Sequence, residues 1–471
     1  MLFNSIPFLF FFVVVTTLYF LIPFKFRWSW LLAASCFFYM FFKPEYILIL
    51  IFTIVIDYIA GIYLEKIEDR VKKRRFLIMS IIANIGVLAV FKYYNFINDN
   101  ITGVAHLFGF SNHMPSLKMI LPIGLSFHTF QAMSYTIEVY RGNQKAEKHF
   151  GIYALYVMFY PQLVAGPIER PQNMIHQFHE KKLFNYDNAA LGLNLIGYGL
   201  FKKLVVADRL GVYVDQVFGN VDAANTSSSV IALLFYYFQI YCDFSAYSDI
   251  ARGTAKFMGF DLMENFNRPY LSKNISEYWR RWHISLSSWF SDYLYTPLAT
   301  AKRDWGKWGI IFALVITFLI AGLWHGAGWN FVIFGFLQGI ALSYEFLTKK
   351  PRKRISAKMP KAIYNGGSLL LAFSYWTFSL IFFRSPTFAI AGKLIHKIAL
   401  MNFHFNLPQL CGEKGPLNLV LSFMVIMALT LRFLLPRDMR LKYPAVFLTV
   451  ITLAIIILGK DVAAEFIYFQ F

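Results

Sequence analysis

Ile320-Ala-Gly-Leu-Trp-His-Gly-Ala-Gly-Trp329 places a single imidazole, His325, in an apolar segment between two runs long enough to span a membrane. Histidine has an unperturbed pKa close to neutrality, so it can accept and return a proton at working pH. An ionisable side chain at membrane depth is costly unless it has a partner or faces a cavity. The flanking Gly322, Gly326 and Gly328 permit close approach of a backbone or a substrate. From this segment alone, His325 is either a proton-transfer group or a helix-packing histidine bonded to a carbonyl.

The composition is that of an integral membrane protein. Of the 471 residues, 58% are hydrophobic and 15% are charged, and the mean hydropathy is +0.50. A soluble domain carries roughly a quarter charged residues, and a spanning helix needs about 20 apolar residues. We therefore predict an all-α, polytopic membrane protein with roughly 10–13 transmembrane helices plus re-entrant or interfacial helices.

The net charge of +19 gathers in short segments beside apolar runs. This pattern indicates anchoring at the cytoplasmic face and contact with membrane lipid, and it argues against nucleic-acid binding. Segments 65–75, 349–361 and 437–442 are strongly basic and are expected in the cytoplasm. Alternation of the helices between these segments places the N-terminus and the C-terminus on the outer face of the cell membrane.

Apolar runs and breaks divide the chain into three parts of a single membrane-embedded domain. We predict N-terminal helices over 1–96, a catalytic core over 118–347 and C-terminal helices over 363–471. Individual apolar runs lie at about 5–23, 28–42, 45–64, 76–95, 364–384, 417–435 and 445–459. Prolines and glycines interrupt the runs 118–140 and 151–168, which indicates either a cavity or a loosely packed loop region. The three cysteines form no spaced pair, so we predict no disulfide framework and no metal site.

Two aspartates lie in the apolar run that contains Tyr241-Cys-Asp-Phe-Ser-Ala-Tyr-Ser-Asp249. Carboxylates inside a membrane span are a functional-site hypothesis by default, and the alternative is a polar contact between helices. Asp243 and Asp249 are therefore predicted to orient helices or to bind a polar ligand.

A second polar block, Ser276-Glu-Tyr-Trp-Arg-Arg-Trp-His-Ile-Ser-Leu-Ser287, combines arginines with tryptophans. Trp279 and Trp282 beside Arg280 and Arg281 are typical of an interfacial helix at headgroup level. The same residue types also bind a phosphate-bearing aromatic ligand, because guanidinium groups bind phosphate and indole rings stack on a base.

Six segments in order give the chain a resemblance to a known family. They are Pro122–Gln131, Phe159–Arg170, Cys242–Asp249, Glu264–Tyr270, Tyr278–Phe290 and Gly322–Ala327. Together they resemble the membrane-bound O-acyltransferases, in particular the bacterial branch that contains alginate O-acetylases and peptidoglycan O-acetylating membrane proteins. The resemblance covers most of the chain from about residue 1 to 350.

This resemblance implies a fold with a central tunnel and a set of site residues. The family's invariant histidine falls on His325, and its second polar position falls on His283. Trp324 and Asn267 lie inside the matching motifs and are predicted to line the substrate site. Relatives take acetyl groups from a cytoplasmic thioester, usually acetyl-CoA, and bind no permanent cofactor. They deliver the group to an extracytoplasmic glycan with a partner that has a serine-esterase-like domain.

The tail, Glu465-Phe-Ile-Tyr-Phe-Gln-Phe471, is similar to a C-terminal motif of the same branch, in which a tyrosine is thought to carry the acyl group. This implies that Tyr468 is the acyl acceptor and His325 the base that removes its phenolic proton. A phenol has a pKa near 10, so a positioned base would assist its attack on a thioester. The alternative is an ordinary aromatic belt at the membrane interface.

The sequence therefore predicts an O-acetyltransferase that moves acetyl from acetyl-CoA toward alginate, peptidoglycan or another envelope glycan. Two other classes of protein remain open at this point. A transporter or flippase would also be polytopic with intramembrane Asp and His, and a scaffold of a polysaccharide export complex would tolerate loss of His325. Neither role needs the Trp-His-Gly and Trp-Arg-Arg-Trp-His motifs.

Overall fold

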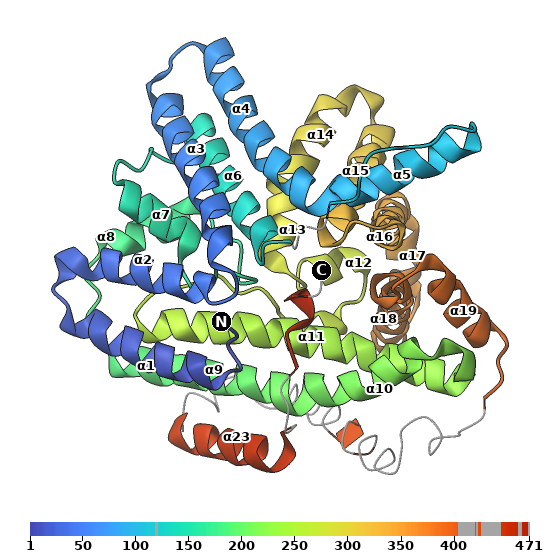
Figure 1. Cartoon of the computed structure of the whole chain (residues 1–471). Helices are drawn as coiled ribbons and strands as arrows, with labels where there is room; N and C mark the ends of the chain where they lie inside the picture. Colours follow the sequence, from blue (N-terminus) through green and yellow to red (C-terminus); the bar gives the residue numbers. More distant parts are fainter. Residues whose placement is uncertain (118–120, 404–419, 421–422, 425–443, 460–463, 470–471) are drawn as a thin grey trace. The chain divides into compact units, whose positions relative to one another are not determined.

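A computed structural model describes residues 1–117, 121–403, 420, 423–424, 444–459 and 464–469 (Figure 1). These residues form helices joined by short connections, and their only β-type pairing is an isolated bridge between Phe266 and Trp282. The all-α prediction is confirmed.

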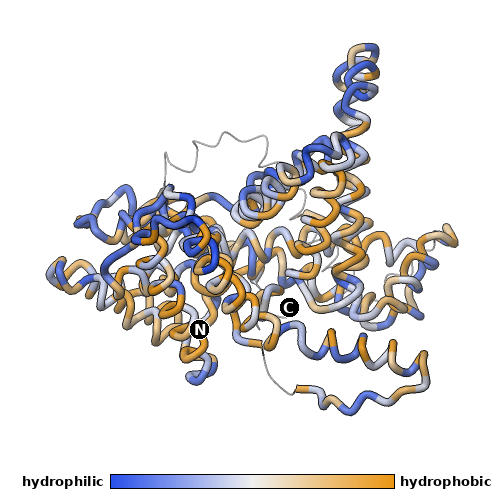
Figure 2. The backbone as a smooth tube through the Cα atoms, turned by 90° about the horizontal axis from the view of Figure 1, so that it is seen from above, coloured by the Kyte–Doolittle hydropathy of each residue, from blue (hydrophilic) through white to orange (hydrophobic). Residues whose placement is uncertain are grey.

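Seven of the described helical segments are long and apolar enough to cross a membrane: Pro44–Lys66, Arg70–Leu107, Tyr186–Gly219, Thr226–Phe257, Lys307–His325, Trp329–Leu347 and Lys361–Arg384. Their surfaces expose large apolar side chains such as Ile82 (63% exposed) and Leu371 (73% exposed), and Figure 2 shows long apolar stretches along the backbone. Side chains of this kind are stable on an outer surface when lipid surrounds them. The chain is a multi-pass membrane protein. The predicted helix 417–435 falls almost entirely outside the described residues.

The described chain divides into two compact units. Unit 1 comprises residues 1–196 and 250–263, and unit 2 comprises residues 197–249 and 264–471. Unit 1 contains α1 (Ile6–Leu21), α2 (Phe24–Met40), α3 (Ile47–Lys66), α4 (Arg70–Leu88), α5 (Tyr94–Leu107), α6 (Leu125–Arg141), α7 (Phe150–Met158), α8 (Pro171–His179), most of α9 (Tyr186–Phe201) and the last turns of α11 (Thr226–Phe257).

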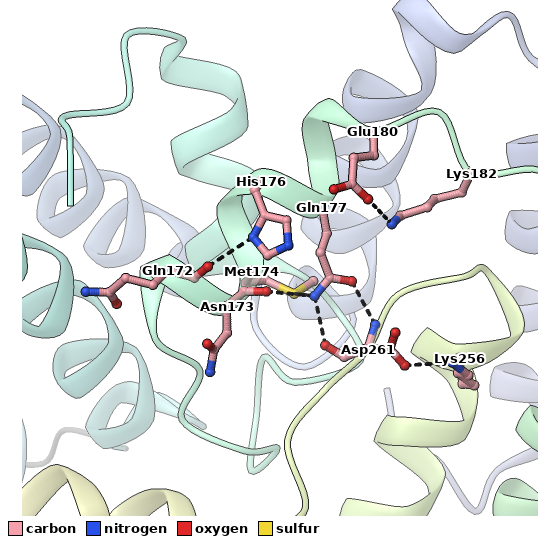
Figure 3. Close-up of polar contacts among 9 residues, drawn as sticks. All are labelled: Gln172, Asn173, Met174, His176, Gln177, Glu180, Lys182, Lys256 and Asp261. Atoms are coloured by element: carbon pink, nitrogen blue, oxygen red, sulfur yellow. Dashed lines mark hydrogen bonds and ion pairs between the residues drawn. The ribbon is translucent and has the colours of Figure 1, made fainter. Parts of the chain in front are cut away.

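Polar contacts hold the helices of unit 1 in register. The buried Asp57 carboxylate of α3 accepts hydrogen bonds from Ser80 Oγ at 2.5 Å and Asn84 Nδ2 at 2.9 Å, both on α4. Figure 3 shows a second contact, in which Gln177 of α8 bonds both the backbone oxygen (3.0 Å) and the backbone nitrogen (2.8 Å) of Asp261. Buried polar groups that bond one another across helices in this way favour one packing arrangement.

Unit 2 carries the motifs of the second half of the sequence. Its described elements include the end of α9, the π-helical η3 (Lys202–Ala207), α10 (Asp208–Gly219), the first part of α11, α12 (Ile275–Trp279), α13 (Ile284–Phe290), the π-helical η6 (Ser291–Tyr295), α14 (Thr296–Ala301), α15 (Lys307–His325), α16 (Trp329–Leu347), α17 (Lys349–Lys358), α18 (Lys361–Arg384), α19 (Phe388–Ala399), α23 (Pro444–Leu458) and the 3₁₀ turns η4 (Val221–Ala223), η5 (Pro269–Leu271), η7 (Arg303–Trp305) and η9 (Ile467–Phe469).

The basic segments are more helical than predicted. The expected loop 65–75 is reduced to residues 67–69, because Asp69 caps α4 and accepts bonds from the Val71 and Lys72 amides at 2.8 Å. Residues 349–358 of the second expected loop form α17. Lysine and arginine are good helix formers, so a basic segment beside a span can extend it as helix. Segment 437–442 lies outside the described residues.

The predicted interruptions in the middle of the chain are confirmed. Gly124 has φ +77° and precedes α6, and α7 ends at Met158, after which residues 159–170 are irregular. Residues 159–169 are buried in protein, so this is not a loosely packed loop. A buried irregular segment of this kind must find its backbone hydrogen-bond partners within the protein.

Candidate functional site

His325 lies at the end of α15, where the close approach of α16 fixes its position. A Cβ atom on Gly322 would lie 2.2 Å from the Phe331 oxygen, and one on Gly335 would lie 2.1 Å from the Phe318 oxygen. Glycine at both positions therefore lets the two backbones touch. The His325 side chain is buried, and its ring lies 5.2 Å from the Phe383 ring, centroid to centroid.

His283 lies between α12 and α13, outside the seven long spans, and is completely buried. Its Nδ1 is 3.3 Å from Asn265 Oδ1, which also accepts bonds from the Ser285 amide (3.0 Å) and hydroxyl (2.9 Å). The Ser285 amide can only donate, so the Asn265 side-chain atom that it contacts must be the oxygen. An oxygen acceptor facing His283 Nδ1 assigns the ring proton to that nitrogen. Nε2 is then the basic nitrogen. Burial lowers the pKa of His283 well below its usual range, and His325 acts in the same direction, so the ring is neutral.

The tail returns to these two histidines. Tyr468 belongs to η9, and its ring centroid lies 3.9 Å from that of Phe244 on α11. The centroid distances from Tyr468 to the rings of His283 and His325 are 6.2 Å and 6.3 Å. Figure 1 shows η9, in red, beside α11. All three predicted catalytic residues therefore meet in unit 2, and Trp324 joins them with its ring 6.0 Å from that of His283.

The two predicted aspartates are each paired with a lysine of η3. Lys203 Nζ lies 2.8 Å from Asp243 Oδ1 and 2.8 Å from Asp208 Oδ1, and Lys202 Nζ lies 3.0 Å from Asp249 Oδ2. Asp243 also accepts a bond from the Ile467 amide at 2.8 Å, which connects it to the tail. Asp243 is thus connected to the site through the polypeptide.

Sequence reasoning missed Asn265, Lys202, Lys203 and Asp208. The lysines interrupt the apolar stretch from Leu195 to Ala207, and two lysines in one span are a signal that two aspartates in another could be their partners. The π-helical turn that carries them has no clear sequence signature, although such turns are frequent at functional sites.

The tryptophans of the second polar block do not form an interfacial belt. Trp279 and Trp282 are only 4–6% exposed. Trp279 donates its indole N–H to Gln338 Oε1 at 3.3 Å, and Trp282 packs 5.0 Å from Phe266. Burial of both indole rings inside unit 2 argues against the headgroup alternative, and ligand binding by these rings stays a prediction.

The arginines of this block differ from one another. Arg281 donates to Glu277 Oε1 through Nε (3.0 Å) and Nη2 (2.8 Å), and through Nη1 to the Asn267 oxygen at 3.3 Å. This geometry favours a structural role over a phosphate contact, and it uses the Asn267 backbone rather than its exposed side chain. Arg280 is exposed and has no ion-pair partner among the described residues, so it stays a candidate for an anionic ligand. The residues that the structure describes contain no cluster of His, Cys, Asp or Glu suited to a metal ion.

Two buried imidazoles and a tyrosine thus lie close together in a polytopic helical protein. Such a group of side chains can carry out acid–base chemistry. Comparison with known proteins defines it further. The profile of the membrane-bound O-acyltransferase family (MBOAT) matches residues 148–384, and the chain belongs to this family. It is accordingly an acyltransferase.

Named relatives act on envelope polymers. The chain is 35% identical to a peptidoglycan O-acetyltransferase of Helicobacter pylori, over 79% of this chain and 74% of that protein. It is 33% identical to a "Probable alginate O-acetylase" of Pseudomonas aeruginosa, over 94% of this chain and 84% of that protein. A teichoic acid D-alanyltransferase of Bacillus subtilis is 26% identical over 51% of this chain and 63% of that protein.

Proposed function

We propose that the chain takes an acetyl group from cytoplasmic acetyl-CoA and passes it toward an extracytoplasmic envelope glycan. The observation that carries the proposal is the proximity of Tyr468 to both His283 and His325, whose ring centroids lie 6.2 Å and 6.3 Å from its own. The names of the relatives support a glycan acceptor and an acetyl group. Acetyl-CoA as donor and a serine-esterase-like partner outside the membrane complete the proposal.

The chemical step uses the groups that meet in unit 2. His325 takes the phenolic proton of Tyr468, and the phenol oxygen attacks the thioester carbonyl carbon. The carbon–sulfur bond breaks, the CoA thiolate leaves, and the imidazolium returns its proton to that thiolate. A positioned base of this kind contributes roughly 10²–10⁴-fold to the rate. His283 Nε2 is a second acceptor for the same proton or a partner that holds the ring.

The aryl ester that results suits onward transfer. A phenol has a pKa near 10, so phenoxide is a much better leaving group than the alkoxide of a sugar. A nucleophile of the partner can therefore take the acetyl group from Tyr468 and restore the free phenol. Burial of the two imidazoles keeps bulk water from hydrolysing the thioester or the ester.

The proposal is tested by thiol release. Purified chain, a glycan acceptor and a partner preparation are incubated with acetyl-CoA, and free CoA thiol is measured. We expect His325→Ala to abolish release. His396→Ala, which changes an exposed histidine on α19, serves as the matched control and should match wild type. Ion- or proton-coupled uptake by the chain without any thiol release would instead favour a transporter.

A further inference from the structure

We infer that Lys203, Asp243 and Asp208 form a tail clamp, a set of positioning residues that binds the backbone of residues 464–467 and thereby sets Tyr468 in the site. The inference rests on the proposed role of Tyr468, and it adds the device that holds that residue in place. The three clamp residues come from η3, α10 and α11, and all are at most 5% exposed.

The clamp bonds the tail at three successive points. Asp208 Oδ2 accepts from the Ala464 amide at 3.3 Å, and Lys203 Nζ donates to the Glu465 oxygen at 2.9 Å. Asp243 Oδ2 accepts from the Ile467 amide at 2.8 Å, at the first residue of η9. A carboxylate at the start of a helical turn is favourable because the first amides of the turn point toward it.

Hydrogen-bonding capacity explains why the clamp binds a backbone. Two carboxylates share one ammonium group at 2.8 Å each, and their second oxygens face the tail as acceptors. Buried charges are stable only when their remaining hydrogen-bonding positions are filled. The tail fills them with two amide donors, which bond the carboxylates, and one carbonyl acceptor, which bonds the ammonium group. Clamp and tail therefore stabilise each other.

Side chains between the bonded positions set the register. Phe466 lies with its ring 4.7 Å from Lys203 Nζ and 5.3 Å from the ring of Tyr247. Tyr468 follows two residues later against Phe244. A shift of the tail by one residue would move both rings out of place, whereas the backbone bonds alone carry no information on side-chain identity. The clamp fixes the tail, and the ring contacts select the tyrosine that meets the histidines.

The test combines hydrogen–deuterium exchange of the tail peptide with the rate of Tyr468 acetylation, in the full-length chain. Ile467→Pro removes the amide that bonds Asp243 and leaves every buried charge unchanged. Ile467→Val keeps that amide and is the matched control. Lys203→Met removes the contact with the Glu465 oxygen from the clamp side. Asp208→Asn weakens the contact with the Ala464 amide, because the acceptor oxygen that remains is uncharged.

We expect tail amides to exchange ~10-fold faster or more in Ile467→Pro and Lys203→Met, because a lost charge-assisted bond shifts local opening by at least that factor. Asp208→Asn should act less strongly, and Ile467→Val should match wild type. The acetylation rate should fall in parallel, with an unchanged KM for acetyl-CoA. Wild-type tail exchange in Ile467→Pro would overturn the clamp. Faster exchange with unchanged glycan acetylation would keep the clamp and reject Tyr468 as the carrier.

Discussion

At the scale of single residues, the sequence located the chemistry but not its partners. His325, His283 and Tyr468 were predicted from motifs, and they meet within unit 2. Arg281 pairs with Glu277, which lies four residues earlier on α12, and this local contact was not predicted from the sequence. Lys203 was missed because its meaning depends on Asp243, 40 residues away. Residue types are readable from sequence, whereas long-range pairing is a property of the fold.

Substituting His325 by glutamine tests its role as a base. Glutamine keeps a polar side chain of similar length but cannot take a proton at neutral pH. We expect acetyl transfer to fall by roughly 10²–10⁴-fold, with a melting temperature close to that of wild type. Steady-state thiol release and a thermal unfolding curve measure the two. Activity within a few-fold of wild type would return His325 to a packing role.

Glu169 gives a pH-dependent stability. Burial raises the pKa of its carboxyl to about 7, although a bond from the Met263 amide at 2.5 Å opposes this. The folded chain therefore holds a proton that the unfolded chain releases, and stability falls as pH rises from the unfolded pKa near 4.5 through 7. The free energy of unfolding of wild type should fall by an amount on the order of 3 kcal/mol over this range, and Glu169→Gln should abolish that fall. Melting temperatures at several pH values would show parallel curves for both proteins if the carboxyl does not titrate there.

At the scale of elements, an apolar run of membrane-spanning length predicted a helix well when it was clearly separated from its neighbours in the sequence. The predicted runs 5–23 and 364–384 correspond to α1 and α18. The prediction of a loop failed at α17, where a run of basic residues is helical. The change of helical pitch at η3 was not predicted. Hydropathy reports the environment of a segment, and it carries little information on the local hydrogen-bond pattern.

The contact between α15 and α16 supports a stability prediction. Gly335→Ala would place a Cβ atom 2.1 Å from the Phe318 oxygen, so the helices must separate and carry His325 away. We expect a loss of about 1–3 kcal/mol in unfolding free energy and a fall in transfer rate. Gly366→Ala on α18 meets nothing within 4 Å and is the control, with unchanged or slightly higher stability. Equal melting temperatures of the two variants would contradict this packing.

At the scale of the whole molecule, composition was sufficient to predict a helical multi-pass membrane protein. The division into two units was not predicted, because α9 and α11 each pass from one unit to the other within a continuous helix. The return of the tail to the histidines was expected only from its resemblance to an acyl-carrying motif.

The membrane orientation that the basic segments predict can be measured by cysteine labelling. After replacement of the three native cysteines, Ala357→Cys on the basic α17 should react with a membrane-impermeant thiol reagent only in opened cells. Ser111→Cys, beyond the far end of α5, should react in intact cells. Both positions are exposed, so the reagent can reach them equally well once it is on the correct side. Labelling of Ala357→Cys in intact cells would reverse the proposed orientation.

The central claim is that Tyr468 accepts acetyl with the help of His325. Purified wild-type chain, His325→Ala and Tyr468→Phe are incubated with radiolabelled acetyl-CoA, and label retained covalently on the chain is counted. Label on wild type alone is the predicted result, since one variant lacks the base and the other lacks the acceptor oxygen. Label that persists in Tyr468→Phe would contradict the claim and place the acceptor elsewhere.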